Sequence, residues 1–259
     1  GNITIDVADN KTLTYSGTAI SLGANTLTLS GGGTLVSGGL TLNNASSKLL
    51  LNSITVDNVS TSLASLGLDV DDNSTVTSLT VGHTTPVSIA SGKTLSGGIT
   101  VTAGSIKLAE AGTLASSISM GGGVLDADNS STLSGTLTQA GNITIDVADD
   151  KTLTYSGDEI SLGAYALTLS GGGTLVSGGL TLNDADSKLL LDSITVDNVS
   201  TSANSLGLDV DNNSTITALS VGHITPVSIA AGKSLSGAIT VSAGSIKLDE
   251  AGTLSSTIA

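Results

Sequence analysis

The 259-residue chain contains no cysteine, tryptophan, phenylalanine or arginine, and only three tyrosines, two histidines, two prolines and one methionine. The absence of cysteine excludes disulfide bonds. The lack of arginine and the scarcity of aromatic rings remove the groups that usually hold sugars in polysaccharide-cleaving clefts. No apolar run reaches about 18 residues, so the sequence predicts no membrane-spanning helix and no membrane insertion of this segment.

Positive charge is also scarce. Eight lysines face 22 acidic residues, which gives a formal net charge of −14. Such a balance disfavours binding to nucleic acid or to anionic lipid surfaces. It favours solubility, divalent cations or a solvated exterior.

The chain does have a short repeated pattern of small aliphatic residues. ITVTAGSIKLAEAGTLASS (99–117) is followed directly by ISMGGGVLDADNSSTLSGT (118–136), and the apolar positions of these two units coincide. Apolar residues two apart are typical of strands with one buried face. Each unit holds three such runs separated by turn residues. We therefore predict an all-β parallel β-helix, a β-solenoid with about three short strands in each rung of about 20 residues.

A longer repeat overlies the rungs. Residues 1–119 match 141–259 at a period of 140, with 23 differences, and residues 120–140 form a further rung of the same type. The first 140-residue repeat (1–140) and the incomplete second one (141–259) should therefore form one continuous rod. Seven rungs are expected in each period: 19–39, 40–62, 63–78, 79–98, 99–117, 118–136 and 137–158. Parallel ladders should then join residues 16 to 23 apart, with Ile106 and Leu108 among the inward side chains.

Acidic turn clusters are the best candidates for a metal site, because oxygen ligands on tight loops suit calcium. The weak candidates are Asp69, Asp71, Asp72, Asp126, Asp128, Asp209 and Asp211, with Asp6 and Asp9 in a further pair. Aspartate is also common in turns for conformational reasons alone, and the glycine-rich nonapeptide of calcium-binding β-rolls is absent. We therefore assign no catalytic, cofactor-binding or metal-binding residue, and calcium is the one ion left open.

Three other patterns resemble functional motifs without meeting their requirements. SGKTL (91–95) and AGKSL (231–235) lack the first glycine of a phosphate loop, and a strand pattern follows where that motif needs a helix. His83 and His223 have no neighbouring acid or second histidine and are interpreted as turn residues. The pairs Thr26/Thr28 and Thr152/Thr154 suggest an ice-binding face, but the unequal lengths of the expected rungs argue against a regular threonine lattice.

The amino-acid sequence of the rungs resembles the passenger repeats of bacterial autotransporters and large surface adhesins, for example in LTLSGGGTLVSGGLTL (27–42) and GSIKLAEAGTL (104–114). The resemblance implies a secreted β-helix displayed on the bacterial cell surface, and it carries over no functional residue. We expect a non-enzymatic extracellular rod in an adhesin or stalk, whose partner is a host or cell-surface ligand. The alternative is a self-assembling subunit of an extracellular filament, sheath or surface layer, whose partner is another copy.

Overall fold

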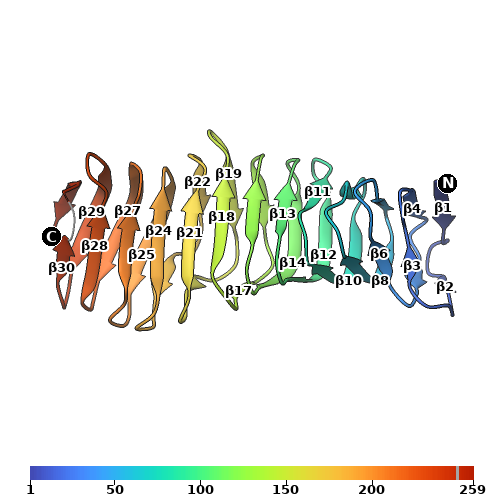
Figure 1. Cartoon of the computed structure of the whole chain (residues 1–259), viewed down its shortest axis with the longest axis horizontal. Coiled ribbons are helices and arrows are strands. Elements are labelled where there is room, and N and C mark those ends of the chain that lie inside the picture. The colour runs from blue at the N-terminus through green and yellow to red at the C-terminus, as the bar shows by residue number, and fades with distance from the viewer. Residues whose placement is uncertain (249–250) are drawn as a thin grey trace.

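The computed structural model describes residues 1–248 and 251–259, and all regular elements in them are β-strands (Figure 1). Thirteen strands pair in chain order into one parallel sheet: β1 (Ile3–Asp6), β4 (Thr26–Ser30), β7 (Lys48–Asn52), β9 (Gly67–Val70), β11 (Thr85–Ile89), β13 (Ser105–Leu108), β15 (Val124–Ala127), β18 (Ile143–Val147), β21 (Ala166–Ser170), β24 (Lys188–Asp192), β26 (Gly207–Val210), β28 (Thr225–Ile229) and β30 (Ile246–Leu248). The chain therefore makes 13 turns, which confirms the predicted β-solenoid.

The other strands form the second and third sides of each turn. They are β2 (Thr12–Thr14), β3 (Ile20–Ser21), β5 (Thr34–Val36), β6 (Leu40–Leu42), β8 (Thr55–Thr61), β10 (Ser74–Val81), β12 (Thr94–Val101), β14 (Thr113–Met120), β16 (Ser131–Leu133), β17 (Leu137–Gln139), β19 (Thr152–Tyr155), β20 (Ile160–Ser161), β22 (Thr174–Val176), β23 (Leu180–Leu182), β25 (Thr195–Thr201), β27 (Ser214–Val221), β29 (Ser234–Val241) and β31 (Thr253–Ile258). The long strands serve both sides: β8 pairs with β5 through Thr55 and Val56, and with β6 through its last three residues.

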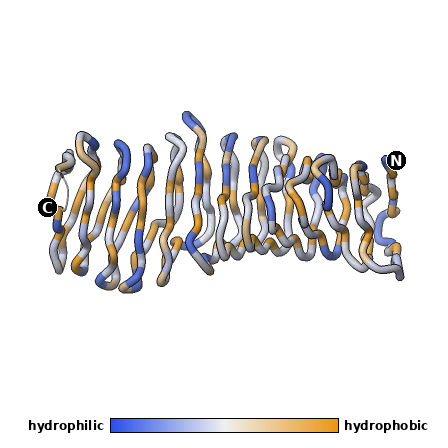
Figure 2. The backbone as a smooth tube through the Cα atoms, in the orientation of Figure 1, coloured by the Kyte–Doolittle hydropathy of each residue, from blue (hydrophilic) through white to orange (hydrophobic). Residues whose placement is uncertain are grey.

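Buried side chains of neighbouring turns lie in register and so stack in columns through the rod. Hydrophobic and hydrophilic residues alternate along the backbone (Figure 2). All five pairs that the units 99–117 and 118–136 predict are in register, including Ile106 with Leu125 and Leu114 with Leu133. Both members of the second pair, like Ile106 itself, are buried. The position where Val76 becomes Ile216 in the second repeat is buried in both repeats, as its apolar character predicts.

One of the expected rungs is wrong. The structure has no short turn confined to 63–78, because the ladder there joins Thr61 directly to Val81. Leu63, the first residue of that expected rung, is 49% exposed in a corner between β8 and β9. Its exposure also explains why Ala203 can replace it in the second repeat. The ladders of the thirteen-stranded sheet range from the short step of Lys48 to Gly67 to the long step of Ile3 to Leu27.

The register drifts by four residues in each repeat. Starting at Ile3, paired residues run through Leu27, Leu49, Leu68, Val87, Leu108 and Ala127 to Val147. The repeat equivalent of Ile3 is Ile143, four residues earlier. Successive side chains alternate between the two faces of a strand, so an even shift keeps the apolar set inward, whereas an odd shift would expose it.

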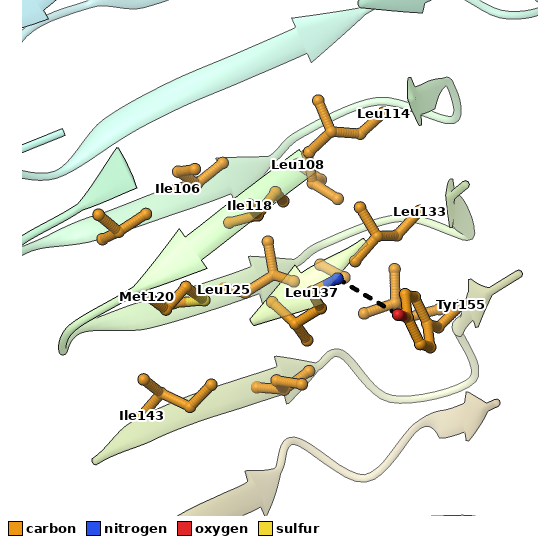
Figure 3. Packing of buried hydrophobic residues seen from close by; sticks show 14 of the residues in the cluster. Ile106, Leu108, Leu114, Ile118, Met120, Leu125, Leu133, Leu137, Ile143 and Tyr155 are labelled. Carbon is orange, nitrogen blue, oxygen red and sulfur yellow. Dashed lines mark hydrogen bonds between the residues drawn. The ribbon is translucent and has the colours of Figure 1, made fainter. Parts of the chain in front are cut away.

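The two repeats meet without a break in the thirteen-stranded sheet, where β15 pairs with β18. On the third side, the described residues give no pairing register between β17 and β20, and side chains replace it. Tyr155 is buried, and its hydroxyl accepts a hydrogen bond of 3.2 Å from the Leu137 amide (Figure 3). Gln139 donates to the Ala166 carbonyl at 2.7 Å. On this third side, a tyrosine and a glutamine therefore connect the two repeats.

Candidate functional site

The most regular surface of the molecule lies on one side of the rod and is lined by threonine. We call this surface the threonine face. It lies on the second side of each turn, the side that follows the strand of the thirteen-stranded sheet, and we define it by the first outward residue there in each of the 13 turns. These residues are twelve threonines and one serine: Thr12, Thr34, Thr55, Thr75, Thr94, Thr113, Thr132, Thr152, Thr174, Thr195, Thr215, Ser234 and Thr253. They are half-buried, apart from the exposed Thr12 and Thr253 in the first and last turns.

Backbone pairing keeps these hydroxyls aligned along the rod. Thr12, Thr34, Thr55 and Thr75 form one uninterrupted column. Thr94, Thr113 and Thr132 form a second, and Thr152, Thr174, Thr195 and Thr215 a third.

The column shifts by two residues at three steps, and each shift still ends on a hydroxyl. Thr75 pairs with Ser96, Thr132 with Thr154, and Thr215 with Ser236. These steps are part of the register drift described above. The second outward position of the affected turns is also serine or threonine, so each step ends on a hydroxyl. Beyond two of these steps, Ser96 pairs with Ala115 and Thr154 with Val176, and the threonine row starts again at Thr94 and Thr152.

The hydroxyls of this face make few bonds to the protein. Thr75 and Ser96 share a hydrogen bond of 2.9 Å, as do Thr215 and Ser236. Within the described part of the chain, Thr113, Thr132 and Thr174 have no side-chain hydrogen bond. Two shallow polar hollows border the face, one lined by Thr113, Thr132, Thr152 and Ser130, the other by Thr55, Thr75 and Asn73. The free hydroxyls and the hollows are therefore available to water or to a ligand.

The sequence itself contains the pattern of this face. A threonine or serine stands directly before an inward apolar residue in each turn, as in Thr113–Leu114 and Thr132–Leu133. Unequal rung lengths argued against a regular lattice. In the structure the corners absorb most of the differences in length, so the threonines align in columns of three or four turns that are offset by two residues at three steps.

Charged residues gather on a different side, the outer surface of the thirteen-stranded sheet, which we call the charged face. Lys48 and Asp69 lie 2.5 Å apart, and Lys188 and Asp209 repeat this pair at 2.6 Å. Lys107 contacts Asp126 at 3.2 Å and Asp128 at 2.6 Å. Exposed pairs of this kind each contribute at most about 1 kcal/mol, so they tune the surface more than they hold the fold.

The calcium candidates fall into two groups in the structure, those paired with lysine and those exposed at turns. Asp69, Asp126, Asp128 and Asp209 are in the lysine pairs of the charged face, and Asp72 pairs with Lys93 at 2.8 Å in a corner. Asp71 and Asp211 are exposed at turns, as is Asp9. Among residues 1–248 and 251–259, no three His, Cys, Asp or Glu side chains come together as a metal site would need. Calcium binding stays a prediction that these contacts do not favour.

Asp126 is the carboxylate whose surroundings oppose its charge. Burial raises the pKa of its carboxyl group, Lys107 lowers it, and Asp128 and Asp146 raise it further. Asp146 stands directly opposite Asp126 in the β15–β18 ladder, and like charges in such pairs destabilise a sheet. Asp72 shows the reverse, because its hydrogen bond to Lys93 lowers its pKa.

These two aspartates should affect stability in opposite directions as pH changes. A raised folded pKa means that the folded state holds its proton more tightly, so the contribution of Asp126 is present at low pH and is lost as pH rises through its folded pKa. As pH rises through that folded pKa, we expect the free energy of unfolding of the Asp126→Asn variant to increase relative to that of the native chain. Asp72→Asn should instead lose stability relative to the native chain as pH rises through the aspartate range. Urea unfolding followed at several pH values measures both, and identical pH profiles for the two variants would contradict the assignment.

The other motifs occupy ordinary structural positions. Lys93 lies in the tight turn before β12, where its amide donates to the Ala90 carbonyl at 2.9 Å, and a strand follows. His83 and His223 are exposed in equivalent corners. Nothing in these contacts gives either motif a chemical role.

Comparison with protein-family models, with curated proteins and with solved structures gives no match. No helix in the described part of the chain is long and apolar enough to cross a membrane.

Proposed function

We propose that the chain is a non-enzymatic extracellular structural repeat, a rod-like segment of a bacterial surface adhesin or stalk. The observation that carries the proposal is the apolar interior, which continues through all 13 turns and across the junction between the repeats. A solenoid gains length in proportion to its number of turns, since each turn packs only on its neighbours. At about 4.8 Å for each turn the chain spans about 60 Å, and each 140-residue repeat adds about 34 Å.

The surface supports a role without catalysis. The hollows beside the threonine face are open and are lined mainly by glycine, serine and threonine. The acidic residues of the charged face stand beside lysines and not in a cleft. A spacer or adhesive rod needs stiffness and a solvated exterior, and both follow from this arrangement.

A display experiment tests the proposal. The full chain, placed between an outer-membrane anchor and an epitope tag, should hold gold-labelled antibody about 60 Å farther from the membrane than the anchor alone. Electron tomography of the intact cells measures this distance. A tag detected only after the cells are permeabilised would contradict an extracellular rod, as would a distance equal to that of the anchor alone.

Self-assembly into an extracellular filament, sheath or surface layer is a second candidate. Turns of the same type pair through the whole rod and across the junction between the repeats, so a further copy can pair in the same way. Sedimentation of the purified chain over a range of concentrations tests this candidate, since assembly between copies depends on concentration.

A further inference from the structure

We propose that the threonine face binds the surface of ice. This inference goes beyond the rod role by assigning a ligand to one side of the rod, and it does not depend on where the protein is displayed. It rests on the chemistry of the face, the spacing of its hydroxyls and their fixed orientation.

The chemistry of the face suits a neutral, repeating lattice of hydrogen-bonding groups. Its defining row contains no charged residue, although the chain carries a net charge of −14. Each threonine presents one hydroxyl, which can donate and accept, and one methyl group. The lysines and aspartates of the described ion pairs lie on the charged face and in one corner. An ionic ligand would gain little from the threonine face, whereas water held in a lattice can meet a hydroxyl on every turn.

The spacing of the hydroxyls is set by the β-structure. Neighbouring turns stand about 4.8 Å apart, and residues two apart on one strand are separated by about 6.7 Å. Both distances are close to repeats of the oxygen lattice on the outer planes of ordinary ice. Where a turn has two outward hydroxyls, as at Thr152/Thr154 and Thr94/Ser96, the face offers a two-dimensional grid. At two steps of the register, Ser96 and Thr154 receive the column; in the next turn their partners are Ala115 and Val176, so the row of first outward threonines carries the lattice from there.

The fold holds this grid in place before any ligand binds. Interior strands such as β14 and β22 pair with a neighbour on each side, so their backbone cannot shift independently. Threonine is β-branched, and its first side-chain torsion is restricted. A surface that is ordered in advance loses little entropy on binding, and weak contacts on many turns add together. Ice is therefore a suitable partner, since it can engage the whole row at once.

Crystalline polysaccharides are the main alternative lattice, and the residue types disfavour them. Sugar rings are usually held by stacking on aromatic side chains. The three tyrosines do not lie on the threonine row: Tyr155 is buried at the repeat junction, Tyr15 is in the first turn, and Tyr165 is in the corner before β21. The test below includes this alternative as an outcome.

The experiment measures how much of the full chain enters ice. A fluorescently labelled sample is partitioned between a slowly growing ice shell and the liquid, together with a labelled protein of similar size that ice excludes. We expect the native chain to be enriched in the ice relative to that protein. Thr113→Tyr with Thr132→Tyr should lower the enrichment several-fold, because two large rings interrupt the middle of the grid.

Two further variants make the result specific. Thr113→Val with Thr132→Val keeps the shape and the strand preference while removing the hydroxyls; it should lower the enrichment less than the tyrosine pair, and circular dichroism confirms that it folds. Thr28→Tyr with Thr168→Tyr places the same rings on half-buried outward threonines of the thirteen-stranded sheet and should leave the enrichment unchanged.

Three outcomes would overturn the proposal. The first is exclusion of the native chain from ice to the same degree as the reference protein. The second is an equal loss of enrichment in the variant of the thirteen-stranded sheet. The third is retention on crystalline chitin or cellulose without enrichment in ice. None of these outcomes changes the distance measured in the display experiment, so failure of this inference is distinguishable from failure of the rod function.

Discussion

Replacing Ile106 by aspartate is expected to lower the free energy of unfolding by about 3–5 kcal/mol, because it leaves an uncompensated charge in the apolar interior. Ile106 is fully buried on β13, and its neighbours in register are Thr85 and Leu125. No basic side chain belongs to the apolar cluster around it. The variant should unfold at a lower urea concentration, which the loss of the β-sheet circular dichroism signal measures.

The second repeat supplies a matched control. Ile246 is the equivalent residue, but it is only partly buried on β30, the last strand of the thirteen-stranded sheet. A charge there keeps access to water, so Ile246→Asp should cost much less than the same change at Ile106. Equal losses of unfolding free energy at the two sites would mean that the difference in burial between Ile106 and Ile246 does not control stability.

Replacing Tyr155 by alanine is expected to cost about 3–5 kcal/mol, since it removes a large buried ring and leaves a cavity at the repeat junction. The ring lies beside Leu133 and Leu137, and its hydroxyl accepts the Leu137 amide proton that has no described carbonyl partner (Figure 3). Tyr155→Phe keeps the ring and removes the hydroxyl. It should cost about 1 kcal/mol, the usual contribution of one hydrogen bond.

Tyr15 provides the control for this position, because it is the repeat equivalent of Tyr155 and is 46% exposed. Tyr15→Ala should change the urea midpoint little. If Tyr155→Ala were equally mild, the tyrosine would not hold the junction together. Proteolysis gives a second measurement, since a weakened junction should admit cleavage near residues 137–160 in the Tyr155 variant only.

Much of the fold could be predicted because strand alternation is a local property of the sequence. Ile99, Val101 and Ile106 alternate with polar residues, and the unit at 118–136 repeats the pattern, so only stacked parallel strands bury both copies. The prediction failed where apolar residues are exposed instead of buried. The rung expected at 63–78 begins where Leu63 and Leu66 are both exposed in a corner.

The candidate surface was predictable in composition but not in geometry. Threonine before each apolar run can be read from the chain, whereas its alignment depends on which residues of neighbouring turns pair. Thr132 pairs with Thr113 on one side and with Thr154 on the other, although the stretch of chain to Thr154 is the longer of the two. Corner loops of different lengths allow this, and their conformations are set by packing.

The sequence by itself determined the strand period, the inward columns and the 140-residue repeat, because alternation and repetition are properties of the chain alone. Only the tertiary structure decided the four-residue drift of the register, the burial of Tyr155 at the repeat junction, and the separation of the threonine face from the charged face. These features depend on which residues meet across neighbouring turns. That pairing is selected by the stacking of the whole rod, in which any even shift keeps the core inward and the corners decide among the possible shifts.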